Sequence, residues 1–556
     1  MAKTLAIVFT LAVVWAQVSV LFPSGTLDDK GNLNFYDYVI FRDSAVHLSL
    51  ISEMQYRFPP TNFAASGEPL KNYHYLYDAF LSIVVKLFPL NPWDLYFRIA
   101  PIALSLLLSL LIYLVTLRLS GDKVASAFAI FFSVFATSFG RVLPWLKTVL
   151  LGRHVTGGNN IFMTDQILGM MTNPQGVVSL IVFLGLFLLL ALYGQTKKTL
   201  YLVFFSVLLG LSFGVKAYGG IVFASGAVAA SVWFLLKDKD HKPIVATALG
   251  LAILVIWVSA TIDSRVAGLQ IAPLWILEKM MVDINRINEP RFVLLQQHFQ
   301  AVGAWWWLVT LTVLELLIYL VGSLGLRLLG ILQLRSYIAG WRKLPAETVF
   351  LLTSAFISFT LPLFFHQSKK AYDIVQFTTY FTLFMGIMFT ISLFALVRKL
   401  PSLKLKVVVL VLMIVCFLLL DEREIAARLK GSSERVVISK DVLEATTYIK
   451  ENLPVDSVFL LSTSQFNLDY LWFSSLTGRR TVYSGSRFAE QVGVDIGKLK
   501  REVDQLWTGG SSNLTFDYVL VRPGEGADFA KIESAQRLQR IYEKSGVVIL
   551  KNSLND

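Results

Sequence analysis

VVSLIVFLGLFLLLALYG, residues 177–194, contains no charged side chain. A run of this length can cross the hydrocarbon core of a bilayer as one helix, which needs about 20 residues. The whole chain shares this bias, since 55% of its 556 residues are apolar and 16% are charged, against about 45–50% and about 25% in soluble proteins. Because the excess apolar surface must face lipid, we predict a polytopic α-helical membrane protein.

Apolar runs of similar length recur along the chain and predict about 11 transmembrane helices. The predicted spans lie near residues 3–22, 97–117, 124–140, 177–194, 199–215, 217–236, 243–262, 302–322, 346–365, 372–397 and 405–420. A shorter apolar segment, AFLSIVVKLFPL at 79–90, is too short to span the bilayer. We therefore expect it to lie in the membrane interface or to dip into it.

The distribution of Lys and Arg predicts the orientation, because short cytoplasmic loops carry an excess of positive charge. Alternate connections are short and basic: they hold Arg118 and Lys123, then Lys197 and Lys198, then Lys237, Lys239 and Lys242, then residues 327–343 and 398–406. We place these connections and the N-terminus in the cytoplasm. The other connections, 23–96, 141–176, 263–301 and 366–371, are then extracytoplasmic, and we expect the chain in the plasma (inner) membrane.

The C-terminal part of the chain is polar and has a different pattern. Short β-rich runs at 458–461, 480–483, 518–521 and 547–550 alternate with helical patterns at 440–452 and 527–544. This alternation is typical of a small α/β domain. We therefore predict two domains: a transmembrane module over residues 1–420, which includes the large outer loop 23–96, and a soluble extracytoplasmic α/β domain over residues 421–556.

The charge and cysteine content exclude two other classes of protein. The formal net charge is +12, but the basic residues cluster between apolar runs, as membrane orientation requires, so we predict no nucleic-acid partner. The only cysteine, Cys416, has no partner for a disulfide within the chain. A secreted scaffold held by disulfides is therefore excluded.

The first outer loop contains the most informative polar residues. If residues 42–54 are helical, Asp43 and His47 share one face, because they are four positions apart. His74 and Asp78 come shortly before the apolar segment at 79–90. The loop thus offers carboxylates and two imidazoles near one membrane face, and we take Asp43, His47 and His74 as candidate catalytic residues.

Less specific roles exist for the same side chains. Asp43 could be a helix-surface aspartate paired with Arg42 or Arg57, and the two histidines could be interfacial anchors. Asp43, His47 and His74 could also supply ligands to a divalent metal such as Mg or Mn, if the loop brings them together. The sequence leaves these alternatives open.

Seven short sequence motifs, three of them in the first outer loop, together resemble a known family. They are FRDSAVHLSLI, PP and GEPLKNYHYLYDAFLS within the first outer loop, TDQILGMMTNPQG at 164–176, GLSFGVKAYGG at 210–220, HQSKKAYDIVQFTTY at 366–380, and LTGRRTVYSG at 476–485. Their order and common sidedness resemble bacterial and archaeal membrane glycosyltransferases of the GT-C superfamily. The resemblance implies a sugar donor carried on polyprenyl phosphate and a loop aspartate as catalytic base, which is Asp43 here. The loop has no DxD motif, in contrast to the metal-dependent oligosaccharyltransferases of that superfamily.

The chemistry of such a transfer agrees with this choice. A general base must take the acceptor's proton, whereas the leaving phosphate needs positive charge more than protonation. One base and direct displacement predict inversion at the anomeric carbon. The candidate substrate and phosphate contacts are Lys369, Lys370, Tyr372, Gln376, Arg141, Arg153, His154, Lys216 and Asp78.

Two functions of other classes remain as alternatives to a glycosyltransferase. One is a transporter or flippase of lipid-linked sugars, and the other is a non-catalytic protein of envelope assembly. The sequence identifies neither the donor sugar nor the acceptor, which could be a glycan, a lipid or a protein.

Overall fold

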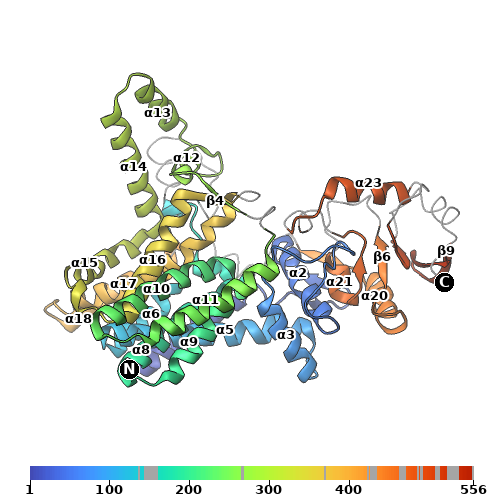
Figure 1. Cartoon of the computed structure of the whole chain (residues 1–556), viewed down its shortest axis with the longest axis horizontal. Helices are drawn as coiled ribbons and strands as arrows, with labels where there is room; N and C mark the ends of the chain where they lie inside the picture. The colour runs from blue at the N-terminus through green and yellow to red at the C-terminus, as the bar shows by residue number, and fades with distance from the viewer. Residues whose placement is uncertain are drawn as a thin grey trace. The chain divides into compact units, whose positions relative to one another are not determined.

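The computed structural model describes the chain apart from residues 136–137, 143–160, 264–267, 368–370, 422–424, 426–434, 462–470, 485–487, 489–491, 508–513, 523–537 and 554–556. The chain forms two compact units (Figure 1). The helical unit comprises residues 1–18, 101–260 and 267–430, and the sheet unit comprises residues 19–100, 261–266 and 431–556.

Within the described residues, eight helical segments are long and apolar enough to cross a membrane. They contain α5 (Ala100–Ser120), α8 (Pro174–Thr196), α10 (Ala217–Asp238), α11 (Lys242–Thr261), α14 (Trp305–Leu324), α16 (Ala346–Phe364), α17 (Thr378–Val397) and α18 (Leu403–Leu420). Three shorter apolar helices are α1 (Ala2–Val18), α6 (Lys123–Val134) and α9 (Thr199–Val215). Every predicted span therefore coincides with an apolar helix.

Two of the shorter helices end before the predicted boundaries. α1 ends at Val18 rather than Phe22, and α6 ends at Val134 rather than near residue 140. At about 1.5 Å per residue, α6 is about 18 Å long, which is less than the thickness of the hydrocarbon core. The apolar composition continues past the end of α6, which is why the sequence pattern overestimated its length.

Burial differs sharply among the apolar helices. α17 packs against α6 and α16 and is buried along most of its length, whereas Phe417 is the one buried residue of α18. An apolar helix such as α18 can keep this much hydrocarbon surface exposed only if its surroundings are also apolar. Its composition and exposure together indicate a lipid-facing position.

The remaining elements of the helical unit are short. They are η2 (Phe139–Arg141), η3 (Ile167–Thr172), β3 (Leu269–Ile271), α12 (Trp275–Val282), α13 (Arg291–Ala301), η4 (Gly325–Gly330), α15 (Ile331–Ala339), η5 (Trp341–Lys343), β4 (Phe365–Gln367) and η6 (Ala371–Phe377). β3 pairs with β4 in an antiparallel ribbon. This ribbon ties the segment before α12 to the segment before α17.

The sheet unit is built around five strands in the order β7-β6-β8-β10-β9. They are β6 (Val458–Leu461), β7 (Arg480–Thr481), β8 (Tyr518–Val521), β9 (Leu538–Lys544) and β10 (Val547–Asn552), with helices α20 (Lys440–Asn452), α21 (Leu471–Thr477) and α23 (Ile496–Trp507). β6 runs parallel to β7 and β8, and β10 runs antiparallel to β8 and β9. The predicted helix at 440–452 and the four predicted strands are present, although β7 ends at Thr481.

The predicted helix at 527–544 is wrong over the part that the structure describes. Leu538–Lys544 is strand β9, which pairs with β10 through a two-residue turn at Ser545 and Gly546. Both turn residues have positive φ, 51° and 79°, as a tight hairpin between twisted strands requires. Residues 523–537 lie outside the described chain.

The first outer loop belongs to the sheet unit. Its elements are β1 (Thr26–Leu27), β2 (Leu33–Phe35), α2 (Tyr38–Met54), α3 (Leu76–Leu87), α4 (Pro92–Asp94) and η1 (Leu95–Ile99). β2 pairs with β5 (Val436–Ile438), and α2 packs against α21. The structure thus differs from the predicted division at 420/421, because the contacts of this loop are made with the C-terminal part of the chain.

Candidate functional site

Asp43 lies in the second turn of α2, with its side chain 36% exposed. The helix begins after Asp37, whose carboxylate accepts the N–H of Ile40 at 2.8 Å and caps the first turn. The Asp43 carboxylate accepts hydrogen bonds from Arg42 Nε at 3.2 Å and Nη2 at 3.1 Å. The pairing with Arg42 considered from the sequence is therefore present, yet the carboxylate remains accessible from outside.

His47 lies one turn further along α2 and is enclosed. Its Nδ1 lies 3.1 Å from both carboxylate oxygens of Asp78 on α3, and the two side chains are 3% and 0% exposed. The His47 ring also stacks on Tyr96 at a centroid distance of 5.8 Å. The roles predicted for His47 in catalysis and for Asp78 in substrate contact stay predictions. In the structure the two enclosed side chains join α2 to α3.

His74 lies near the same pair, with Tyr73 next to both histidine rings. Its ring stacks almost parallel on Tyr73 at 5.2 Å, and the Tyr73 ring lies 6.3 Å from the His47 ring. Burial, together with the nearby carboxylates of Asp78 and Asp43, raises the pKa of Tyr73 well above its usual value. The Tyr73 hydroxyl is therefore protonated at neutral pH and can act as a hydrogen-bond donor.

The metal site considered from the sequence does not form. Among the described residues, no three His, Cys, Asp or Glu side chains come together in a group that could hold a metal ion. For Asp43, His47 and His74 the cause is local, because His47 is directed to Asp78 and the His74 ring stacks on Tyr73.

A second polar cluster lies in the helical unit around Lys216, in the break between α9 and α10. Lys216 is 5% exposed, and its Nζ lies 5.7 Å from the ring centroid of Tyr218. Asp165, from the segment before η3, and Asp373, from η6, both lie within electrostatic range of this cluster. Burial is the main cause that raises the pKa of Asp165 to about 6. The positive charge of Lys216 lowers this pKa, and the carboxyl group of Asp373 raises it.

This cluster brings together three of the motifs that carried the family resemblance. Lys216 was a candidate from the sequence, whereas Asp165 and Asp373 were not singled out. The Tyr218 hydroxyl donates to Gln367 Oε1 at 3.1 Å, which joins α10 to β4. Asp165 and Asp373 lie in two of the motifs that carry the resemblance, and both motifs are predicted on the same side of the membrane. Their spacing in the sequence does not show that the two residues are close in space.

The other candidates of the helical unit have different settings. Tyr372 is 43% exposed and donates to Asp283 at 3.3 Å, and Gln376 is partly buried on the same turn, η6. Lys369, Lys370, Arg153 and His154 lie outside the described residues, as does the side chain of Arg141.

An apolar groove of about 460 Å³ opens beside α14. Its walls are formed by Phe139, Val142, Phe162, Leu317, Ile318, Val321 and Gly322. A Cβ on Gly322 would lie 2.2 Å from the ring of Phe162, so glycine permits the close approach of this ring to α14. Phe162, which lines the groove, precedes Asp165 of the polar cluster by three residues in the sequence.

No protein-family model matches the sequence, and no curated protein matches it. Two membrane proteins are among the solved structures that match. AglB, the archaeal oligosaccharyltransferase from Archaeoglobus fulgidus in complex with an inhibitory peptide and a dolichol-phosphate, is 14% identical with a TM-score of 0.49, over 100% of this chain and 74% of AglB. ArnT from Cupriavidus metallidurans, bound to undecaprenyl phosphate, is 13% identical with a TM-score of 0.41, over 99% of this chain and 98% of ArnT.

Both likenesses lie below 25% identity and below a TM-score of 0.5, and neither assigns a family, an activity or a residue role to this chain.

Proposed function

We propose that this protein transfers a glycosyl group from a polyprenyl-phosphate donor to an acceptor on the extracytoplasmic face, with inversion and with Asp43 as the general base. The proposal rests above all on the setting of Asp43. Its carboxylate is accessible, and its helix is fixed to α3 by the enclosed His47–Asp78 pair. A base held in this way is suited to take a proton from an acceptor hydroxyl or amide.

We assign the donor's phosphate to the Lys216 cluster. A buried lysine can form a strong charge-assisted hydrogen bond to a phosphate oxygen. The apolar groove beside Phe162 offers the surface that a polyprenyl tail needs, because hydrocarbon is driven out of water and into such grooves. Tyr372 and Gln376 on η6 are further candidates for contacts to the donor.

The charge balance of this cluster limits how the phosphate binds. Among the described residues, this cluster places the carboxyl groups of Asp165 and Asp373 within electrostatic range of Lys216, so a phosphate should bind better when the negative charge of Asp165 is reduced. A proton on Asp165 would do this, and so would a divalent cation such as Mg²⁺ or Mn²⁺. The two carboxylates are the oxygen ligands that such a cation would use together with phosphate oxygens.

The function is tested with the purified chain in lipid nanodiscs. We expect it to release polyprenyl phosphate from either a polyprenyl-phosphate hexose or a polyprenyl-phosphate pentose when an acceptor extract is supplied. NMR of the product is expected to show inverted anomeric configuration. Failure to bind or cleave either donor would reject the proposal, and movement of intact donor across a vesicle membrane would favour the flippase alternative.

Replacing Lys216 with methionine is expected to weaken donor binding by about 10- to 100-fold, because a charge-assisted hydrogen bond contributes about 1.5–3 kcal/mol. Methionine keeps most of the side-chain volume and removes the charge. Equilibrium binding of a fluorescent polyprenyl-phosphate sugar measures the change. Lys198→Met, at an exposed lysine in a different connection, is the matched control, and equal effects of both substitutions would contradict the assignment.

Donor binding is also expected to depend on pH through Asp165. The phosphodiester of the donor does not titrate between pH 5 and 8, whereas the pKa of Asp165 is raised to about 6. As the pH falls through 6, this carboxylate becomes neutral and its repulsion of the phosphate is lost, so the affinity should rise by about tenfold. Asp165→Asn should bind as the wild type does at low pH and show no such dependence. An affinity that rises with pH would contradict this assignment.

A further inference from the structure

Three aromatic side chains from different segments of the helical unit lie together. The ring centroid of Trp275, on α12, lies 5.9 Å from that of Tyr372, on η6, and 5.8 Å from that of His366, on β4. The plane of the Trp275 ring is inclined to these two rings by 55° and 63°. Stacked rings cover each other, whereas inclined rings leave part of each face uncovered, and Tyr372 is 43% exposed. These three residues, which we call the aromatic corner, therefore offer flat apolar surface to a ligand.

The indole ring of the aromatic corner is held in place by the protein. Trp275 Nε1 donates to the backbone carbonyls of Pro362 at 2.9 Å and Phe365 at 2.7 Å. A tryptophan that only anchors a protein at a membrane boundary keeps its N–H toward water or lipid headgroups, and this one does not. The ring is therefore fixed before a ligand binds, which lowers the entropic cost of binding.

Two charged side chains border the aromatic corner. The Tyr372 hydroxyl donates to Asp283 Oδ2 at 3.3 Å, and the Arg286 guanidinium lies 5.9 Å from the centre of the Tyr372 ring. Asp283 and Arg286 come from the segment that directly follows α12. A carboxylate accepts hydrogen bonds from hydroxyl groups, and a guanidinium donates them to oxygens. Aromatic surface beside both kinds of polar group fits a sugar, which has C–H bonds on its faces and hydroxyl groups around its edge.

The aromatic corner adjoins the cluster to which we assign the donor's phosphate. Gln367, next to His366 on β4, accepts a hydrogen bond from Tyr218 of the Lys216 cluster at 3.1 Å. On η6, Asp373 of the same cluster directly follows the tyrosine of the corner. In a glycosyl phosphate a single oxygen joins the sugar ring to phosphorus. A phosphate bound at the cluster therefore brings its sugar to the neighbouring surface.

We propose that the aromatic corner is the subsite for the donor's sugar, with Tyr372 and Trp275 against its C–H face and Asp283 and Arg286 at its hydroxyl groups. This inference rests on the proposed function and adds to it the residues that select the sugar. The candidate membrane span Tyr372–Val397 begins at the corner. A sugar bound there stands at the end of a membrane-crossing helix, as a sugar on a lipid carrier must.

Lipid binding to the full chain in nanodiscs tests the subsite without an acceptor and without any transfer. The two probes are polyprenyl phosphate and the same lipid bearing a hexose or a pentose. Tyr372→Leu should weaken binding of the sugar-bearing lipid by about three- to tenfold, because one aromatic contact is lost. It should change binding of polyprenyl phosphate by less than about twofold, since the phosphate contacts remain.

Three further variants separate the aromatic contact from other effects. Tyr372→Phe keeps the ring and should lose clearly less affinity for the sugar-bearing lipid than Tyr372→Leu. Trp275→Leu should show the same selective loss as Tyr372→Leu. Trp306→Leu removes a tryptophan of α14 that is 85% exposed and should alter binding of neither lipid. If Trp275→Leu does not fold, because the hydrogen bonds of its N–H are lost, the variants of the exposed Tyr372 decide the question.

Equal loss for both lipids in Tyr372→Leu, or no loss for either, would overturn the sugar subsite and leave the phosphate assignment in place. An equal loss in Tyr372→Phe would overturn the aromatic contact, and a selective loss in Trp306→Leu would show that the effect is not local to the corner. If neither lipid binds to the wild type, the proposed function fails and the subsite falls with it. Selective loss in a chain that transfers sugar to no acceptor would support the subsite and reject the transferase.

Discussion

Asp43→Asn is expected to lower the rate of glycosyl transfer by about 100- to 10,000-fold, the usual contribution of a positioned general base. Asparagine has the same shape as aspartate but cannot accept a proton at neutral pH. The side chain is 36% exposed and bonded only to its neighbour Arg42 in the described contacts, so the fold should tolerate the change. The rate is measured as polyprenyl phosphate released per unit time at saturating donor.

The control for this substitution is Asp29→Asn, at an exposed aspartate of the same loop. It removes the same charge and should leave the rate unchanged. If Asp43→Asn transfers as fast as the wild type, Asp43 is not the base. If both variants lose activity equally, the effect arises from the net charge of the loop rather than from a single proton acceptor.

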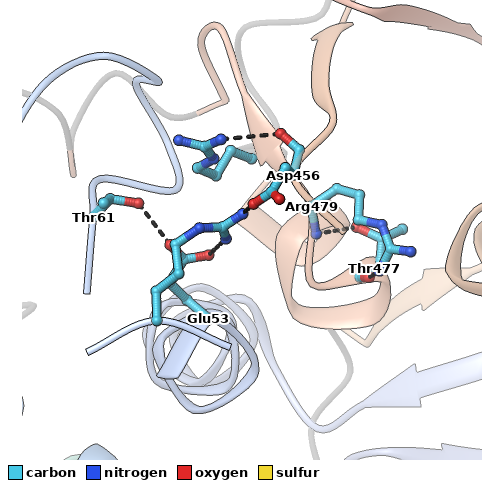
Figure 2. A network of polar contacts seen from close by, with 7 residues as sticks. Glu53, Thr61, Asp456, Thr477 and Arg479 are labelled. Atoms are coloured by element: carbon cyan, nitrogen blue, oxygen red, sulfur yellow. Dashed lines mark hydrogen bonds and ion pairs between the residues drawn. The ribbon is translucent and has the colours of Figure 1, made fainter. Parts of the chain in front are cut away.

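Glu53→Ala is expected to destabilise the sheet unit by about 3 kcal/mol. The Glu53 side chain is 2% exposed and accepts hydrogen bonds from Arg57 Nη1 at 3.1 Å and Thr61 Oγ1 at 2.6 Å. Figure 2 shows Glu53, Thr61 and Asp456 in this network. The Arg57 guanidinium also pairs with Asp456. Alanine removes the buried partner of Arg57 and the acceptor of the Thr61 hydroxyl, and these lost contacts account for the cost.

The loss is at the lower end of the range for buried pairs, because Arg57 is 19% exposed and keeps its contact with Asp456. Proteolysis of the C-terminal segment at increasing urea concentrations measures this loss of stability as a lower urea midpoint of unfolding. Glu68→Ala, at an exposed glutamate of the same loop, should leave the midpoint within about 0.5 kcal/mol of the wild type. A similar loss in both variants would mean that the buried pair contributes nothing specific.

The neighbouring residues Arg479 and Arg480 bind different carbonyl groups near this network. The Arg479 guanidinium donates to the backbone carbonyls of Lys450 and Leu453 at the end of α20, at 3.1 and 2.5 Å. Arg480 donates to the carbonyl of Asp456 at 3.0 Å. The first arginine thus satisfies carbonyls that the end of a helix leaves unpaired, and the second supports the turn that presents Asp456 to Arg57.

Much of the fold could be predicted because lipid imposes a simple rule on the chain. A segment that crosses a bilayer must be apolar over its whole length, so every helix of this kind left a visible run in the sequence. The rule does not state where a helix ends, and α6 stops at Val134 inside an apolar run. β9 was mistaken for a helix because its hairpin turn, Ser545-Gly546, is a weaker signal than the spacing of apolar residues before it.

The candidate site was only partly predictable. Asp43 and His47 could be placed on one helix because their spacing is local. The His47–Asp78 pair joins residues 31 positions apart, and its formation depends on how α3 packs against α2. The cluster of Lys216, Asp165 and Asp373 likewise depends on tertiary contacts between motifs, for which no periodic pattern exists.

The packing of α2 against the C-terminal part of the chain has a consequence for biosynthesis. Ser49 donates to the carbonyl of Leu471, 422 positions later, and Thr481 bonds to Phe63, 418 positions earlier. At about 5–20 residues per second, the ribosome makes α2 roughly 20 to 80 s before its partner. During that interval the apolar side of α2 has no permanent cover, so a nascent chain that stalls after its last span would present this helix to chaperones and proteases.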